Sequence, residues 1–167
     1  KKKQNQDIEV DLITTMPNRY NQYNIEAKST EKVRNISIRR INVPASDLSR
    51  FLGPIIFLFY AMKVMIFVRN KEYDLIFATS SRLATIALGT MISKMKKVPI
   101  FIDIRDIFYE TLEQLKKGKL LKIFLPLVST IESFTITNST KINLVSEGFF
   151  DYFKKKYPSK SYSYLPN

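Results

Sequence analysis

Short, almost uninterrupted runs of apolar residues recur through the second half of the chain, separated by longer segments with helical spacing. The runs at 74–78 (DLIFA), 98–104 (VPIFIDI) and 141–145 (KINLV) have the length of β-strands. The segments at 81–95 and 118–137 lie between them and have the length of helices. Strands that are apolar on both faces are typical of a parallel sheet covered by helices on both sides. The sequence therefore predicts an α/β fold with a doubly wound parallel sheet.

The other predicted elements continue the same alternation. Residues 16–24 are rich in Pro, Asn and Tyr and predict a loop. The length of 167 residues suits one domain, so a single domain is expected over 1–167. Further strands are expected at 7–15, 35–41 and 161–165, and further helices at 48–69, 107–116 and 146–157.

The predicted helix at 48–69 is apolar on almost every side. A membrane-spanning helix needs roughly 20 mostly apolar residues. Pro54 near the start and Lys63 at the centre argue against such a span. The sequence leaves two interpretations open. The helix is either buried on two sides, or it lies against a membrane or against another domain.

The composition excludes several kinds of chemistry. The chain has no cysteine, which excludes disulfides, thiolate metal sites and a cysteine nucleophile. It also has no histidine, which removes the usual general base and the commonest metal ligand. Any acid–base chemistry must therefore fall to Asp, Glu, Tyr or Lys. Neither a metal nor a cofactor is expected.

The chain is strongly basic, with a net charge of +12 from 27 basic and 15 acidic residues. The segment 115–160 holds nine lysines and three acidic residues. Such an excess suits a solvated surface, an anionic membrane or a nucleic acid. Nucleic-acid binding is the weakest of these, because only 151–164 interleaves lysines with aromatic residues. The lysines expected to face an anionic membrane are Lys116, Lys117, Lys119 and Lys122.

Polar residues follow three of the predicted strands, at 79–82, 103–106 and 146–148. In parallel sheets, ligands bind beyond the carboxyl ends of the strands, where helix N-termini also favour anions and hydroxyls. The alternative is that these residues have purely structural roles, with Ser80 and Ser146 as N-caps of helices and with an internal Arg–Asp salt bridge. The candidate binding residues at these strand ends are Asp103, Arg105, Asp106 and Glu110 after the second strand, and Ser80, Ser81, Arg82, Ser146 and Glu147 after the other two.

Five segments of the chain together match one known set of motifs. Thr14 to Asn18 match the motif TxxPN, and YDLIFATSSR (73–82) resembles pDvIxAtSPP, with Ser81 and Arg82 in place of the prolines. The segment 99–110 is similar to PfvxEvRDlWPE, with Phe108 and Tyr109 in place of Trp and Pro. Residues 145–149 match vSEgf, and 165–167 match the start of iPNG. With these five segments the chain resembles the N-terminal half of a bacterial glycosyltransferase of family 4 of the GT-B fold, in the branch similar to fucosaminyltransferases.

The resemblance implies a Rossmann-like, acceptor-binding domain. It also implies that the full-length enzyme transfers a sugar from a nucleotide-sugar donor, with retention and without a metal, to a lipid-linked or oligosaccharide acceptor. The pathway would be the biosynthesis of a surface polysaccharide such as O-antigen, lipopolysaccharide or capsule, in the cytoplasm at the inner face of the membrane. By this likeness Asp106 binds acceptor hydroxyls or caps the next helix, and Arg105 holds an acceptor phosphate or pairs with a neighbouring carboxylate.

The resemblance further implies that the chain is a fragment. The family's first strand and helix would precede residue 1, and the donor-binding domain would follow Asn167, so the fragment alone is expected to be inactive. In the family's strand order, 3-2-1-4-5-6, that first strand separates 7–15 from 74–78. We therefore expect these two strands to pair directly, or a strand from another chain to lie between them.

The alternative is a stand-alone doubly wound binding or regulatory module without catalytic activity. A receiver-like module would need an acidic pair after its first strand, which here ends ITTMPN. A dinucleotide-binding module would need clustered glycines, but the four glycines are isolated at 53, 89, 118 and 148.

Overall fold

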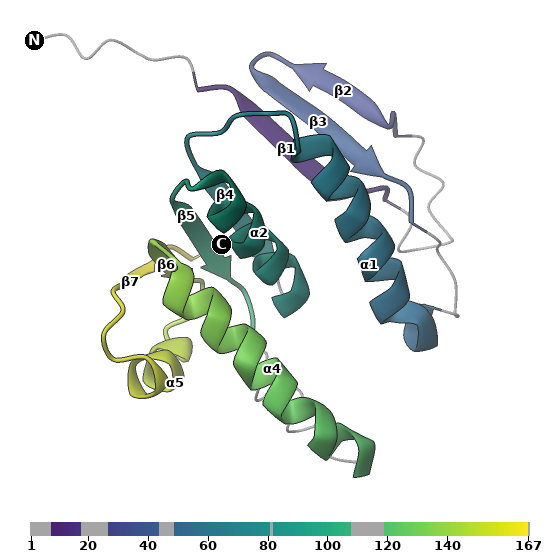
Figure 1. Ribbon diagram of the computed structural model, residues 1–167. Helices are drawn as coiled ribbons and strands as arrows, with labels where there is room; N and C mark the ends of the chain where they lie inside the picture. The colour runs from purple at the N-terminus through teal and green to yellow at the C-terminus, as the bar shows by residue number, and fades with distance from the viewer. Residues whose placement is uncertain (1–7, 18–26, 44–48, 81, 108–118, 167) are drawn as a thin grey trace, which may run out of the picture. The chain divides into compact units, whose positions relative to one another are not determined.

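The computed structural model describes residues 8–17, 27–43, 49–80, 82–107 and 119–166 (Figure 1). The chain divides into two compact units, Lys1–Asn70 and Lys71–Asn167, which are described separately. The predicted helix at 107–116 falls almost entirely outside the described residues, as does most of the predicted loop at 16–24.

The first unit contains a small mixed sheet with the strand order β1-β3-β2. β1 (Val10–Thr15) pairs in parallel with β3 (Ile36–Ile41), and β2 (Thr30–Val33) pairs with β3 as an antiparallel hairpin. β1 and β3 were expected from their apolar pattern, but β2 was not. Its turn contains Arg34 with a φ of 53°. Two-residue hairpin turns usually have the sequence Asn-Gly or Asp-Gly, so the sequence Arg-Asn at 34–35 does not predict a hairpin.

The first unit also contains α1 (Ser49–Val68), close to the predicted bounds. Its face formed by Leu52, Ile55, Phe59, Met62 and Ile66 is exposed, although every one of these side chains is apolar. Lys63 lies over the ring of Phe59, with its Nζ 4.4 Å from the ring centroid. Among the described residues, no helix combines the length and the apolar character that crossing a membrane requires.

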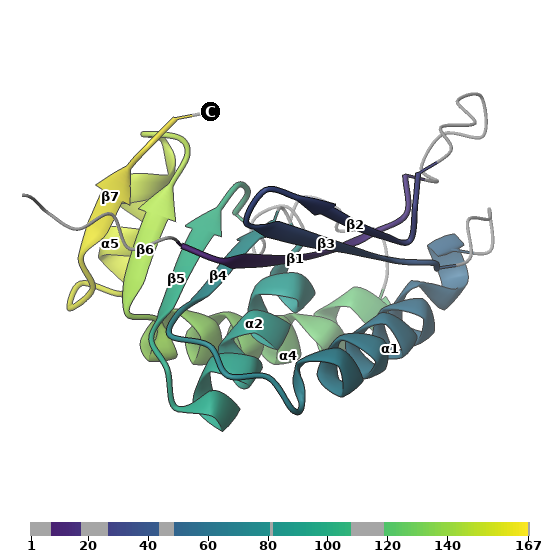
Figure 2. The same ribbon diagram turned by 90° about the horizontal axis from the view of Figure 1, so that it is seen from above.

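The second unit is an all-parallel four-stranded sheet with the order β4-β5-β6-β7 (Figures 1 and 2). This confirms the predicted α/β class with a parallel sheet flanked by helices. The strands are β4 (Ile76–Ser80), β5 (Ile100–Ile104), β6 (Lys141–Leu144) and β7 (Tyr162–Tyr164); the helices between them are α2 (Leu83–Lys96), α4 (Lys119–Asn138) and α5 (Phe149–Lys156).

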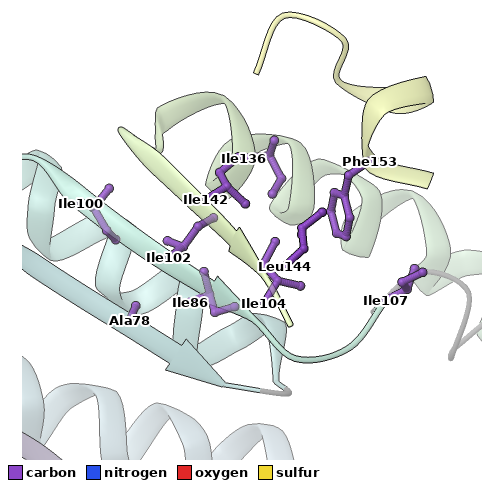
Figure 3. Packing of buried hydrophobic residues seen from close by; sticks show 10 residues of the cluster. All are labelled: Ala78, Ile86, Ile100, Ile102, Ile104, Ile107, Ile136, Ile142, Leu144 and Phe153. Carbon is purple, nitrogen blue, oxygen red and sulfur yellow. The ribbon is translucent and has the colours of Figure 1, made fainter. Parts of the chain in front are cut away.

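The three described helices of this unit pack on the same face of the sheet. The residues that meet there are Ala78, Ile86, Ile100, Ile102, Ile104, Ile107, Ile136, Ile142, Leu144 and Phe153 (Figure 3). The strand residues in this cluster alternate along β5 and β6, so they all point to one side. A chain that crosses the sheet in a single direction with right-handed connections places every helix on one face. Helices on both faces were expected, and among the described residues of this unit the second face has none.

The predicted direct pairing of the strands at 7–15 and 74–78 would join the two units, which are described separately, so it stays a prediction. β1 is hydrogen-bonded to β3, and β4 is hydrogen-bonded to β5, in two different sheets. The other alternative, in which a strand from another chain lies between these two strands, also stays a prediction.

Candidate functional site

The carboxyl ends of β4, β5 and β6 lie side by side, which confirms that the three polar segments meet at one edge of the sheet. Thr79 is in register with Asp103, and Asp103 is in register with Asn143. The segment 103–106 therefore lies between the segment after β4 and the segment after β6. Parallel pairing of neighbouring strands produces this meeting directly, because each strand ends at the same edge.

The carboxylate of Asp103 is the centre of a hydrogen-bonded cluster at this edge. It is 6% exposed. Thr79 donates its hydroxyl to Oδ2 over 2.7 Å, and Asn143 donates Nδ2–H to Oδ1 over 2.7 Å. Arg105 donates Nε–H to Oδ2 over 3.1 Å, which also makes an ion pair. Both carboxylate oxygens are thus satisfied by side chains from the neighbouring strands and from the adjoining loop.

The cluster extends to β7 as a row of one polar residue per strand. Ser163 is in register with Asn143, and its hydroxyl lies 3.2 Å from the Oδ1 of Asn143. Asn143 also donates to the backbone carbonyl of Leu165 over 3.1 Å. Thr79, Asp103, Asn143 and Ser163 form what we call the polar row. The row lies on the face opposite the apolar core, because its members alternate with the core residues.

The polar row lowers the pKa of Asp103. Burial alone would raise the pKa of this carboxyl, since burial disfavours the charged form. The hydrogen bonds from Asn143, Thr79 and Arg105, together with the charge of Arg105, outweigh burial and bring the pKa below its ordinary value. Asp103 is therefore an anchored carboxylate rather than a proton donor at neutral pH.

Arg105 forms the internal ion pair that was one of its two expected roles. Its Nε–H also approaches the hydroxyl of Thr79, at 2.9 Å. The side chain remains 45% exposed at the sheet edge. Asp106 is half-buried next to Arg105, whereas Glu110 lies outside the described residues. The structure thus brings Asp103 and Arg105 into direct contact.

The other candidate residues after β4 and β6 act differently from simple helix caps. Ser80 accepts a hydrogen bond from the backbone N–H of Arg82 over 2.9 Å, so it stabilises the turn before α2. Arg82 occupies the N-cap position of α2, without a side-chain cap, and its own side chain is exposed. Ser81 lies outside the described residues.

The expected N-cap role of Ser146 is also not formed. α5 has Gly148 at its N-cap position and no side-chain cap; Ser146 contributes only its carbonyl, to the N–H of Phe149. Glu147 is exposed at the same edge. Neither Ser146 nor Glu147 contacts the polar row through a hydrogen bond among the described residues.

The lysines proposed to face a membrane fall largely outside what the structure describes. Lys116 and Lys117 precede the described part of α4, and Lys119 and Lys122 lie in its first turns, where side chains are not described. Other lysines from 115–160 have internal partners instead. Lys160 donates to the carbonyls of Thr137 and Ser139, and Lys154 lies 4.9 Å from the centroid of the Phe150 ring.

A second buried polar cluster lies between α4 and α5, and sequence reasoning missed it. Glu132 is fully buried and accepts hydrogen bonds from Lys156 at 2.7 Å, Tyr157 at 2.9 Å and Tyr152 at 3.1 Å. Burial, followed by the nearby charge of Glu132, raises the pKa of Tyr157, although its contact with Ser133 opposes this. The available signal was Tyr152 and Lys156, four residues apart on one face of α5, with Tyr157 directly after the helix.

Among the residues that the structure describes, no group of three or more Asp, Glu, His or Cys side chains is arranged to hold a metal ion. The described side chains at the sheet edge offer hydrogen bonding and charge: carboxylates accept from hydroxyls, and guanidinium groups bind oxyanions.

The segments that carry the resemblance to glycosyltransferases occupy strand ends in the structure. Thr14 and Thr15 end β1, and 79–82 and 103–106 follow or end β4 and β5. Asn18 and 108–110 lie outside the described residues. In comparisons with known proteins, no protein-family model matches this chain, and no curated protein matches it either.

Proposed function

We propose that this chain is the acceptor-binding half of a bacterial glycosyltransferase of the GT-B fold, family 4, in the branch that resembles fucosaminyltransferases. The observation that supports the proposal best is the Asp103 cluster at the carboxyl edge of an all-parallel sheet. Ligands of such sheets bind at this edge. The edge combines buried, anchored polar groups with the exposed side chains of Arg82, Arg105 and Glu147.

The proposed reaction transfers a sugar from a nucleotide-sugar donor to a lipid-linked or oligosaccharide acceptor, with retention of configuration. Asp106 and Glu147 accept hydrogen bonds from acceptor hydroxyls, and Arg105 provides positive charge for the acceptor. The donor is bound mainly by a further domain. The product belongs to the biosynthesis of a surface polysaccharide.

The test compares activity and stability in the full-length enzyme. Arg105→Ala and Asp106→Asn are expected to reduce sugar transfer to a membrane-lipid acceptor without unfolding the protein. Arg105→Ala also removes one donor from Asp103, so it should lower the thermal unfolding midpoint slightly, but far less than it lowers activity. Parallel losses of activity and stability would mean that both residues are only structural. The 167-residue chain alone should transfer no sugar. Acceptor binding without turnover by the full-length protein would instead support the alternative, a binding module.

The same proposal places the enzyme at the cytoplasmic face of the membrane. Its support is the net charge of +12 and the exposed apolar face of α1. Each basic residue near an anionic surface contributes about 1 kcal/mol, and the attraction fades within a Debye length, about 8 Å at physiological salt. An exposed apolar helix face adds contact with the headgroup region.

Liposome co-sedimentation tests this placement. The chain should sediment with vesicles that contain phosphatidylserine at low salt, and less at high salt. Changing Lys116, Lys117, Lys119 and Lys122 to Gln should reduce sedimentation. A matched control changes four other lysines, Lys71, Lys94, Lys97 and Lys141, to Gln. If both quadruple variants and the wild type sediment alike, the lysines only solvate the surface.

A further inference from the structure

The sheet of the first unit has one face that is both apolar and exposed. Alternate side chains of a strand point to the same side of a sheet, and the strand register places those of neighbouring strands next to one another. The apolar residues on this side are Val10, Leu12, Val33, Ile36 and Ile38, which we call the apolar sheet face. The first four are 40%, 45%, 46% and 37% exposed. A sheet normally buries its apolar face against another layer, so this face is expected to have a partner.

The helix of the first unit lies on the other face of this sheet. Arg39 points to that other face, and its guanidinium carbon lies 5.6 Å from the centroid of the Phe67 ring in α1. Ile41 points to the same side as Arg39 and is only 5% exposed. α1 runs along this side of the sheet (Figure 2). Among the described residues of the first unit, no helix covers the apolar sheet face.

The rim of the apolar sheet face carries an ion pair. Glu31 is in register with Ile38, and Arg40 follows Ile38 by two residues, so both charged side chains lie on the same side as the apolar residues. Arg40 donates Nη1–H to Glu31 Oε2 over 2.8 Å, and the two side chains remain 19% and 40% exposed. A surface with adjacent opposite charges is complementary to a second copy of itself, because the arginine of each copy attracts the glutamate of the other. An anionic membrane would instead repel Glu31.

We infer that the apolar sheet face is a dimer interface, at which two copies of this chain pack sheet against sheet. The inference goes beyond the proposed function and does not depend on it. Sheets that pack face to face lie about 10 Å apart, with the side chains of both inner faces between them. A twofold contact uses the same surface on both copies, which suits an apolar face with a self-complementary ion pair at its rim.

The size of the face determines the strength of the dimer. β1 and β3 are six residues long. Such strands span about 20 Å and three strands span about 14 Å, so each copy contributes roughly 300 Å² of flat surface. Stable complexes bury about 800 Å² per partner. The dimer is therefore expected to be weak and reversible, and its population should depend on protein concentration.

Sedimentation velocity across a concentration series measures the dimer in the purified 167-residue chain. Every sample carries Phe77→Lys, which places a charge on the end strand of the other sheet and so suppresses association through that strand. Leu12→Lys brings one charge from each copy into the interface and should raise the dissociation constant at least about a hundredfold. Leu58→Lys is the matched control, since Leu58 is 67% exposed on α1, and should leave the dissociation constant nearly unchanged. Circular dichroism of each variant shows whether the fold is kept.

A second measurement does not require the sheet to tolerate a lysine at position 12. Glu31→Arg and Arg40→Glu each break the ion pair within the chain and give the two copies like charges at the interface. Each variant alone should therefore dimerise at least about tenfold more weakly. Mixing the two variants should restore a dimer that contains one copy of each, because a positive rim then meets a negative rim. Only contact between chains can produce this recovery, since the ion pair within each chain stays broken.

Three results would overturn the inference. The first is a chain with Phe77→Lys that stays monomeric at every concentration. The second is equal dimerisation of the Leu12→Lys and Leu58→Lys variants, and the third is the absence of recovery when the two charge variants are mixed. A full-length protein that stays monomeric while the 167-residue chain dimerises would overturn the inference for the full-length protein. Sugar transfer by that monomer would leave the proposed function intact.

Discussion

Asp103 and Glu132 are two buried carboxylates that the chain stabilises in different ways. Asp103 receives hydrogen bonds from two neighbouring strands and from Arg105, at the edge of the sheet. Glu132 lies between α4 and α5 and accepts hydrogen bonds from the ammonium group of Lys156 and from the hydroxyls of Tyr152 and Tyr157. In both cases a negative charge is buried because several donors converge on it. Removing the charge or a donor should therefore have a measurable effect on stability.

Asp103 should make the unfolding free energy depend on pH in the acidic range. Its pKa is lower in the folded chain than in the unfolded chain, so its contribution is fully present above the unfolded value of about 3.9. The contribution is lost as the pH falls through the folded pKa. In thermal unfolding followed by circular dichroism, the midpoint of the wild type should fall more steeply below about pH 4 than that of Asp103→Asn.

The control for this measurement is Asp151→Asn, which removes one exposed carboxylate from the first turn of α5. It should leave the acid slope of the wild type almost unchanged. Equal slopes for the wild type and Asp103→Asn would show that the hydrogen bonds to Asp103 do not hold its charge.

Removing Glu132 should destabilise the fold substantially. Glu132→Ala leaves Lys156, Tyr152 and Tyr157 without their shared acceptor and opens a gap between α4 and α5. Breaking a buried pair costs about 3–5 kcal/mol. Because Lys156 is 29% exposed and can turn toward water, we expect a loss of about 3 kcal/mol in urea unfolding. Glu147→Ala, at an exposed position, should change stability by less than about 0.5 kcal/mol. A similar small effect for both would mean that the cluster contributes nothing.

At the scale of single elements, the glycines of α2 and α1 differ in the space around them: Gly89 is tightly packed and Gly53 is not. Gly89 lies where α2 packs directly on the sheet, and a Cβ there would stand 2.7 Å from the Cβ of Ala78. Gly53 in α1 has nothing within 4 Å of the same position. A residue larger than glycine at position 89 would not allow α2 to approach β4 this closely. The close approach packs the helix directly against the sheet.

Gly89→Ala should destabilise the chain and Gly53→Ala should stabilise it. Alanine is favoured over glycine inside a helix by about 1 kcal/mol. At Gly89 the clash with Ala78 opposes this gain, because overpacking costs about 1–3 kcal/mol and Ala78 has no flexible end to move. Urea unfolding of the two variants measures whether each substitution raises or lowers the free energy of unfolding. The double variant Gly89→Ala, Ala78→Gly should recover part of the loss. Equal stabilisation by both single substitutions would show that α2 can move away from the sheet.

At the scale of the whole molecule, the sheet of each unit ends in a strand that has a hydrogen-bonded neighbour within that sheet on one side only. Within its sheet, β4 is hydrogen-bonded to β5 on one side only, and Phe77 in β4 is 55% exposed, as is the preceding Leu75 at 53%. It carries neither lysine nor proline, the residues that commonly protect an edge strand. β1 is likewise the end strand of the first sheet. Free edges of this kind pair with strands from other chains.

The isolated chain is therefore expected to self-associate through β4. Phe77→Lys places a charge on this edge and should shift the chain toward the monomer in sedimentation velocity across a concentration series. Leu127→Lys is the matched control, since Leu127 is also 55% exposed but lies on α4. Equal association of both variants would show that the apolar surface in general, rather than the strand edge, drives it.

The chain sequence by itself determined where the principal strands lie and which edge of the parallel sheet is polar. The run IFIDI forms a buried strand as predicted, whereas the predicted burial of DLIFA is wrong for Leu75 and Phe77, which are 53% and 55% exposed. A strand followed by a helix must place 79–82 and 103–106 at the same end. These are local consequences of apolar pattern and chain direction. The contact of Arg105 with a neighbouring carboxylate was also within reach, because Asp103 is two residues away.

Only the tertiary structure decided which side chains meet across the sheet and between the helices. Asn143 lies 40 residues from Asp103 in the chain, and Lys156 lies 24 residues from Glu132. No local spacing identifies such pairs, because strand register and helix packing are settled by the burial of whole faces at once. The same holds for the division into two sheets and for β2, whose polar sequence pairs only because β3 offers it an edge. Burial of the apolar residues determines which face of each strand packs against the helices. The resulting strand register places the four residues of the polar row next to one another on the opposite face.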